Sequence, residues 1–421
     1  MKQNLKNKII QGGLNVSFLL FFALSLAIPT GYSYGAVGAL LFTFLGLGAL
    51  KRGRCTLNTW VLVGSLLAMG LVWGLSFDGW GAWASTDLFI KYWLAAFVLA
   101  VVSLWGIQHQ FVQWGVGLGG LGALLIALYQ NFALGISKAT GYTNAIQYGG
   151  IAMYLGLASW CIALVGARSW THRLVCGALG TCGVLASFLS ETRGSWVAAI
   201  ALCIVLVVVL IQHGYARWAL GGGVAMALIV GALLVPYGQK IEKRVDMAVD
   251  EVQQYVREPE IAAETSVGQR LEQWRTATLL IQMKPLTGWG NFGNRDGKQM
   301  LVDQGLAHPS IMEYGHAHNE IIDMLAKRGV LGLFFLLMFY GIPVYLFWPT
   351  KKRIQNLSAE RRSAAFSIRL IAILLPIAYF AFGWTQVFFG HNSGNMFYIF
   401  SLAAFWGALQ RLEGQLLQTT N

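Results

Sequence analysis

Long apolar runs recur along this chain from one end to the other, and they constrain its fold more than any other feature. Residues 201–211 and 330–348 belong to two of them. A helix of about 20 apolar residues crosses the roughly 30 Å of hydrocarbon in a bilayer and satisfies its own backbone hydrogen bonds there. The chain is 56% hydrophobic and only 11% charged, with a mean hydropathy of +0.57, which departs from the balance of soluble domains. The sequence predicts an all-α polytopic membrane protein.

Hydropathy predicts about twelve transmembrane helices, centred near residues 19, 42, 66, 97, 119, 157, 181, 204, 227, 339, 377 and 403. The first follows three lysines but no obvious small-residue cleavage site follows it, so we interpret it as a retained helix. One long polar segment separates spans nine and ten. We therefore predict three parts: residues 1–236 with spans one to nine, residues 237–328 as a large helical loop subdomain, and residues 329–421 with spans ten to twelve.

The distribution of basic residues predicts the orientation. An even number of spans places both termini on one side, and the segments on that side hold most of the Lys and Arg outside the long loop. Short loops on the other side hold little more than Lys138 and Arg193. The positive-inside rule then predicts cytoplasmic termini and an outward-facing loop. The net charge of +12 is explained by topology, so we do not expect nucleic acid binding. The five cysteines lie in or beside apolar runs, where packing is the expected role.

The long loop has its own predicted helices. Residues 240–257 carry apolar side chains at helical spacing between charged ones, which predicts an amphipathic helix on protein or on the lipid interface. A second helix is expected to begin with Ser266 as N-cap and to end near Pro285. Residues 285–294 are rich in Gly and Asn and predict a shaped loop. A third helix is expected over about residues 318 to 328, with a glycine at the junction to the next span.

Four outward-facing residues are candidates for chemistry. Arg193 lies in Ser-Glu-Thr-Arg-Gly-Ser-Trp, Arg270 in Ser-Val-Gly-Gln-Arg-Leu-Glu-Gln-Trp-Arg, and His316 and His318 in Gly-His-Ala-His-Asn-Glu. Each arginine also has a plainer interpretation. Arg193 could extend from the lipid boundary toward water, and Arg270 could belong to a solvated helix face. Arg193, however, opposes the positive-inside trend, and a His-x-His-Asn-Glu run at a helix start is less ordinary. Weaker candidates for substrate binding are Arg275, Asn319 and His391, together with His316.

Two arginines and a histidine at an outer membrane surface suit one kind of reaction. Guanidinium groups match phosphate oxygens and stabilise a diphosphate as negative charge develops on it. A histidine accepts the proton of a hydroxyl that becomes a nucleophile. These groups suit transfer from a lipid diphosphate to an alcohol. Because the chain has no Asp-x-Asp pair and shows no evident third ligand beside His316 and His318, we expect a site without a metal.

These motifs give the chain a resemblance to the O-antigen ligase family, which is related to O-antigen polymerases and bacterial protein O-oligosaccharyltransferases. Three blocks carry it: Thr-Arg-Gly-Ser-Trp at Arg193, Ser-x-Gly-x-Arg-Leu-x-x-Trp at Arg270 followed by Pro-Leu-Thr-Gly-Trp-Gly, and His-Ala-His-Asn-Glu-Ile-Ile-Asp-Met-Leu-Ala-Lys-Arg-Gly from His316. The order of the blocks and their membrane context match the family.

The resemblance implies a function and its location. The family transfers O-antigen polysaccharide from undecaprenyl diphosphate to a sugar hydroxyl of lipid A–core, at the periplasmic face of the bacterial inner membrane, with inversion and without a metal or other cofactor. His318 matches the family histidine as base or acceptor-positioning group. Arg193 and Arg270 match its two essential arginines, which bind the diphosphate. The expected partners are the lipid-linked donor, lipid A–core and membrane lipid.

Three alternatives stay open. A polymerase joins two lipid-linked glycans and is barely separated from a ligase by sequence, although the single large late loop and the His-x-His-Asn block favour the ligase. A protein O-oligosaccharyltransferase usually has an added C-terminal region. A transporter would place several charges inside its spans or show repeated broken helices, whereas Lys91 is nearly the only charge within a span here.

Overall fold

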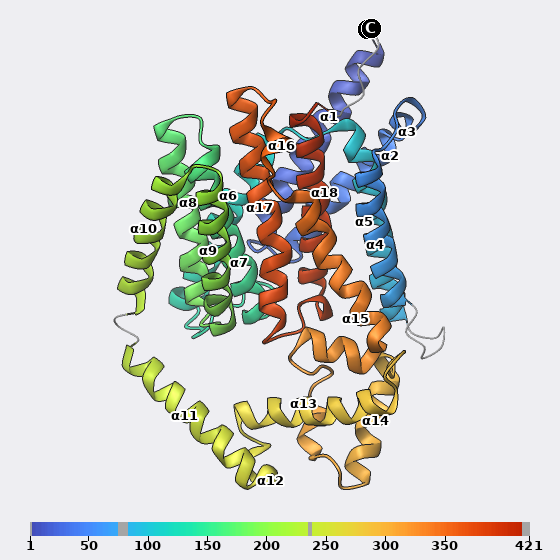
Figure 1. Cartoon of the computed structure of the whole chain (residues 1–421), viewed down its shortest axis with the longest axis vertical. Coiled ribbons are helices and arrows are strands. Elements are labelled where there is room, and N and C mark those ends of the chain that lie inside the picture. The colour runs from blue at the N-terminus through green and yellow to red at the C-terminus, as the bar shows by residue number, and fades with distance from the viewer. Residues whose placement is uncertain (1, 75–82, 235–237, 415–421) are drawn as a thin grey trace.

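The computed structural model describes residues 2–74, 83–234 and 238–414, and these contain helices and no strand (Figure 1). All twelve predicted centres lie within helices: α1 (Lys2–Leu24), α2 (Gly31–Leu45), α4 (Leu57–Gly74), α5 (Trp83–Trp105), α6 (His109–Leu128), α7 (Ala145–Cys161), α8 (Trp170–Leu189), α9 (Arg193–Gln212), α10 (Ala216–Leu234), α15 (Glu320–Phe347), α17 (Ala359–Gly383) and α18 (Asn392–Leu412). The all-α membrane class is confirmed.

Nine helices within the described residues are long and apolar enough to cross a membrane. Helix α2 is shorter, and α10 and α18 are not among the nine. The figure of about twelve spans therefore stays a prediction. The short helices α3 (Gly48–Arg52) and α16 (Lys351–Ile354) lie at the same end of the bundle as the beginning of α1 (Figure 1).

Helices α7 and α17 form the centre of the bundle. In the most apolar 18-residue stretch of each helix, 89% of the residues are buried for α7 with its continuation to Gly166, and 83% for α17. The share is 28% for α9, at the periphery. Buried tyrosines add polar links between the helices: Tyr398 donates to the carbonyl oxygen of Phe339 at 3.0 Å, and Tyr379 donates to that of Gly394 at 2.9 Å. Because a hydroxyl in hydrocarbon needs a partner, these bonds fix how α15, α17 and α18 pack.

The loop subdomain lies at the end of the bundle opposite the beginning of α1 (Figure 1). It contains α11 (Gly238–Arg257), α12 (Pro259–Ala262), α13 (Ser266–Met283), α14 (Asn291–Asp303) and the 3-10 helix η4 (Pro309–Glu313). A small apolar core of its own joins α13, α14 and η4 through Leu280, Leu301 and Ile311, each fully buried. The subdomain therefore combines its own packing with contacts to α15.

Several expectations for the loop need correction. Thr265, not Ser266, is the N-cap of α13, because its side chain accepts the backbone N–H of Gly268. Helix α14 was not expected, and it begins inside the predicted shaped loop, directly after Gly290 with φ 74°.

The predicted amphipathic helix is confirmed as α11. Of its apolar side chains, Val249, Val252 and Val256 are exposed rather than packed on protein.

The helical backbone of α15 is interrupted at Gly329, and the loop subdomain joins the membrane bundle at this point. Gly329 has φ 61° and ψ −165° inside α15, at the predicted junction. The N–H of Val330 donates to the carbonyl of Pro285 at 2.9 Å, and the N–H of Gly290 donates to that of Lys327 at 2.7 Å, so residues 285–290 lie against the break. The next residue back, Arg328, stacks over Trp73 of α4 at 4.1 Å and donates to Asn291 of α14 at 3.3 Å.

We predict that Gly329→Ala destabilises the protein whereas Gly341→Ala, in the same helix, does not. The Gly329 backbone conformation is nearly exclusive to glycine and costs other residues on the order of 1–3 kcal/mol. A Cβ there would also lie 2.2 Å from the carbonyl oxygen of Leu286, while one at Gly341 meets nothing within 4 Å. Thermal unfolding in detergent measures both, and equal unfolding temperatures for the two variants would contradict this role of Gly329.

Candidate functional site

The three residues with the strongest sequence argument come together from three separate elements. Arg193 is the first residue of α9 and is exposed, Arg270 lies on α13, and His318 lies in the segment between η4 and α15. Burial and then the charge of Arg193 lower the pKa of Arg270. The charge of Arg270 in turn acts on His318. Arg270 therefore lies close enough to the guanidinium of Arg193 and to the imidazole of His318 for its charge to interact with both.

The backbone and ring of His318 are both held in a specific orientation. His318 has φ 53°, a left-handed conformation that is uncommon outside glycine and clusters at functional sites. Its Nδ1 lies 3.1 Å from Oε1 of Gln386, a residue 5% exposed in the turn after α17. Because an amide oxygen only accepts, Nδ1 carries the hydrogen in this arrangement. The lone pair is then on Nε2, which is the atom that can accept a proton.

Aromatic rings gather around His318. The ring of His316 lies 4.4 Å from that of His318, and the ring of Tyr314 lies 4.8 Å from it, both edge to face. His391, which directly precedes α18, lies 6.2 Å from His316, and its Nε2 is buried without a hydrogen-bond partner among the described residues. Two of the weaker candidates, His316 and His391, therefore belong to the same cluster as His318.

The imidazoles of this cluster favour the neutral form. Burial and the neighbouring His318 lower the pKa of His316 to about 4. Burial, then the charge of Arg270, lowers the pKa of His318, and burial lowers that of His391. The hydrogen bond to Gln386 opposes this effect at His318. A neutral His318 near pH 7 is the form that a general base requires.

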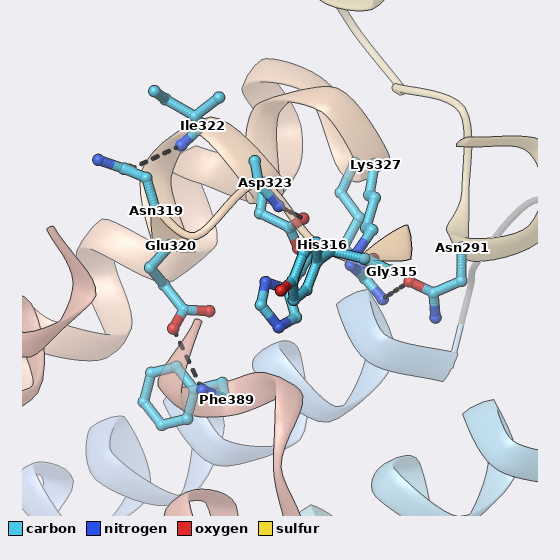
Figure 2. Close-up of polar contacts among 12 residues, drawn as sticks. Asn291, Gly315, His316, Asn319, Glu320, Ile322, Asp323, Lys327 and Phe389 are labelled. Atoms are coloured by element: carbon cyan, nitrogen blue, oxygen red, sulfur yellow. Dashed lines mark hydrogen bonds and ion pairs between the residues drawn. The ribbon is translucent and has the colours of Figure 1, made fainter. Parts of the chain in front are cut away.

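Two other candidates have structural contacts instead. Arg275 donates to both carboxylate oxygens of Glu272, at 2.9 and 2.7 Å, and to the carbonyl of Leu306. Asn319 is the N-cap of α15, and its Oδ1 accepts from the backbone of Ile322 at 3.1 Å (Figure 2). Substrate binding by either residue stays a prediction.

Charged side chains of α15 hold the backbone of the segment that carries His316 and His318. Asp323 accepts the N–H of Ala317 at 3.0 Å, and Lys327 pairs with Asp323 at 2.9 Å and donates to the carbonyl of Gly315 at 2.7 Å (Figure 2). Glu320, 1% exposed, accepts the N–H of Phe389 at 3.1 Å and so connects α15 to the turn that carries Gln386.

Sequence reasoning missed Gln386, Asp323 and Lys327 as supports of the site. The sequence did contain a signal for Asp323 and Lys327, because an acid and a lysine four residues apart face each other on a helix. It contained no such signal for Gln386. Within the described residues, no group of three or more His, Cys, Asp or Glu is arranged to hold a metal ion. Metal independence itself stays a prediction.

Comparisons with known proteins give a match to one family model and similarity to two relatives. Residues 178–337, which include Arg193, Arg270 and His318, match a family model described as O-antigen ligase. An uncharacterized protein of Haemophilus influenzae is 25% identical over 404 residues, covering 93% of this chain and 97% of that protein. An O-antigen ligase of Escherichia coli is 20% identical over 244 residues, covering 57% of this chain and 55% of that protein.

We predict that His318 titrates below the ordinary histidine value of 6.5 and that Gln386→Glu raises its pKa. A carboxylate in place of the amide stabilises the imidazolium. Gln386→Met removes the acceptor without adding charge and should therefore not raise the pKa of His318. Diethyl pyrocarbonate reacts with neutral imidazole, so its rate at His318 against pH, read by peptide mass spectrometry, gives the pKa. A value at or above 6.5 in the unmodified chain would contradict this environment.

Proposed function

We propose that this chain, whose residues 178–337 match a family model described as O-antigen ligase, transfers an O-antigen polysaccharide from undecaprenyl diphosphate to a sugar hydroxyl of lipid A–core. The family and the apolar helices indicate a membrane enzyme of glycosyl transfer in lipopolysaccharide biosynthesis. The approach of Arg193, Arg270 and His318 to one another, from elements far apart in sequence, is the observation that carries the more specific proposal.

The arginines bind and stabilise the leaving group. The diphosphate of the donor carries negative charge that increases as its bond to the anomeric carbon breaks. Arg193, exposed at the beginning of α9, and Arg270, beside it on α13, offer forked donors that stay charged at any relevant pH. Two positive charges held side by side repel each other, and a diphosphate between them relieves that repulsion.

His318 activates the acceptor. Its Nε2 takes the proton of the acceptor hydroxyl while the hydroxyl oxygen forms a bond to the anomeric carbon. The bond between that carbon and the diphosphate oxygen breaks on the opposite side, and its electron pair leaves with the diphosphate. This single displacement inverts the anomeric configuration. No covalent intermediate with the protein and no metal are required by these steps.

The proposed location is the bacterial inner membrane, with the site facing the periplasm and both termini in the cytoplasm. Its support is the position of the loop subdomain at the end of the bundle opposite the beginning of α1 (Figure 1), together with the basic residues of the opposite loops. Lipid-linked donor and lipid acceptor then reach the site from the same leaflet.

The direct test supplies both substrates to the purified protein in the presence of excess chelator. We expect lipid A–core to gain glycan mass and His318→Ala to abolish the gain. Growth of the lipid-linked glycan would instead identify a polymerase. Transfer to neither, with transfer to an added protein acceptor, would identify a protein O-oligosaccharyltransferase. Loss of activity in chelator alone, restored by a divalent cation, would contradict the metal-free mechanism.

We predict that Arg193→Ala and Arg270→Ala each lower kcat on the order of 10²- to 10³-fold, because each removes a donor worth about 2.7–4 kcal/mol to the developing charge. Arg295→Ala, which removes an exposed arginine of α14 in the same subdomain, is the matched control and should stay within about twofold. Initial rates at saturating donor measure all three. Folded Arg193→Ala or Arg270→Ala protein with full activity would remove that arginine from the mechanism.

A further inference from the structure

A buried lysine on α14 contacts the segment that directly precedes His318. Lys298 is 4% exposed, although lysine is rarely buried so fully unless it is paired. Its ammonium donates to Oε1 of Gln273 at 2.7 Å and to the carbonyl oxygens of Tyr314 at 3.0 Å and Ile311 at 3.4 Å. All three hydrogen bonds go to neutral oxygens, so the positive charge is solvated by dipoles rather than neutralised by contact.

These bonds hold one side of the segment that carries His318. Lys298 holds the carbonyl of Tyr314, while α15 holds the next residues through Lys327 at the Gly315 carbonyl and Asp323 at the Ala317 N–H. Trp274 of α13 donates to the Ala317 carbonyl at 2.9 Å. Three helices therefore fix successive backbone groups directly before the left-handed His318, and α14 acts on this segment through Lys298.

The charge of Lys298 also reaches the imidazole. Besides burial, the groups that act on the pKa of His318 are Arg270 on α13 and Lys298 on α14, which lower it, and Gln386 after α17 and Asp323 on α15, which raise it. His316 and Tyr314 complete the surroundings. Burial lowers the pKa of Lys298 itself to about 8, with Lys327 acting in the same direction and Asp323 against it.

We propose that Lys298 is a positioning residue for glycosyl transfer, which fixes the backbone of residues 311–314 ahead of His318 and supplies to the imidazole a positive charge whose own hydrogen bonds go to neutral oxygens. The inference rests on the proposed function for the meaning of the rate, but not for the contact between Lys298 and its segment. A merely structural lysine would affect stability alone. A positioning lysine affects kcat and the titration of His318 in a folded protein.

The first test is Lys298→Met, of similar length but without charge, with Arg295→Met on the same helix as the matched control. In Lys298→Met we expect kcat to fall on the order of tenfold to a hundredfold, because small misplacements of a catalytic group carry costs of this size. The KM for the donor should stay within about threefold, since the buried Lys298 side chain offers almost no surface to a bound donor. The acid limb of kcat/KM should move to higher pH, toward 6.5. Wild-type kcat and an unmoved acid limb would overturn the proposal.

The second variant, Gln273→Glu, keeps Lys298 and adds a negative charge beside it, with loss of the hydrogen bond that Nε2 of Gln273 donates to the Ile311 carbonyl at 2.8 Å. A carboxylate at this position pairs with Lys298, so Lys298 remains and the positive field on His318 is offset. We expect the acid limb to rise in this variant too, and Lys298→Arg, which retains the charge, to keep it near the wild-type position. If Lys298→Met does not fold, an unmoved acid limb in Gln273→Glu overturns the electrostatic part of the proposal.

A reaction-independent measurement separates this inference from the proposed function. The rate of His318 modification by diethyl pyrocarbonate against pH gives its pKa in any folded variant. If the wild-type chain transfers no glycan, the proposed function fails, while a raised His318 pKa in Gln273→Glu and Lys298→Met still supports the link to Lys298. Identical titrations in these variants and in Arg295→Met would contradict it.

Discussion

The requirement that backbone polar groups be hydrogen bonded within the hydrocarbon governs the whole architecture. It makes the spans helical and displaces irregular backbone, which shapes catalytic sites, to helix ends and to the loop between α10 and α15. Arg193 is the first residue of α9, His318 lies just ahead of α15, and Gln386 lies in the turn after α17. In the described residues the backbone is therefore helical in the apolar spans and irregular near the candidate site residues.

Much of this could be predicted from sequence because the bilayer imposes a strong periodic signal. All twelve predicted centres fall within helices. Topology also grouped Arg193, Arg270, His316 and His318 on one face, and the family resemblance then singled out His318 among the two histidines. Local polar signals were weaker. Thr265 and Ser266 are both common N-cap residues by type, and the Gly- and Asn-rich beginning of α14 concealed a helix that packs against α13, η4 and α15. The residues behind the site were hidden for a similar reason. Nothing local distinguishes the buried Lys298 or Gln386 from a solvated lysine or glutamine.

Positive charge accumulates around the site with incomplete local compensation. The carboxylate of Asp323 is paired with Lys327 and bonded to backbone, so it offsets the charges of Arg270 and Lys298 only from a distance. Holding cations together costs stability in the empty protein, which is the usual condition of a site that awaits an anion. In the proposed reaction the diphosphate supplies the missing negative charge, so that donor binding and subdomain stability are coupled.

In the proposed reaction the same charges impose a compromise on His318 as the base. Cations that stabilise a departing diphosphate also disfavour the imidazolium, so the site that best releases the leaving group weakens His318 as a proton acceptor. Glycosyl transfer tolerates this, because in an oxocarbenium-like transition state the bond to the leaving group is largely broken before the new bond forms. The acceptor hydroxyl becomes strongly acidic only as its oxygen bonds to the anomeric carbon. A weak base then suffices, provided it is accurately placed, and the contacts that fix residues 311–318 supply that placement.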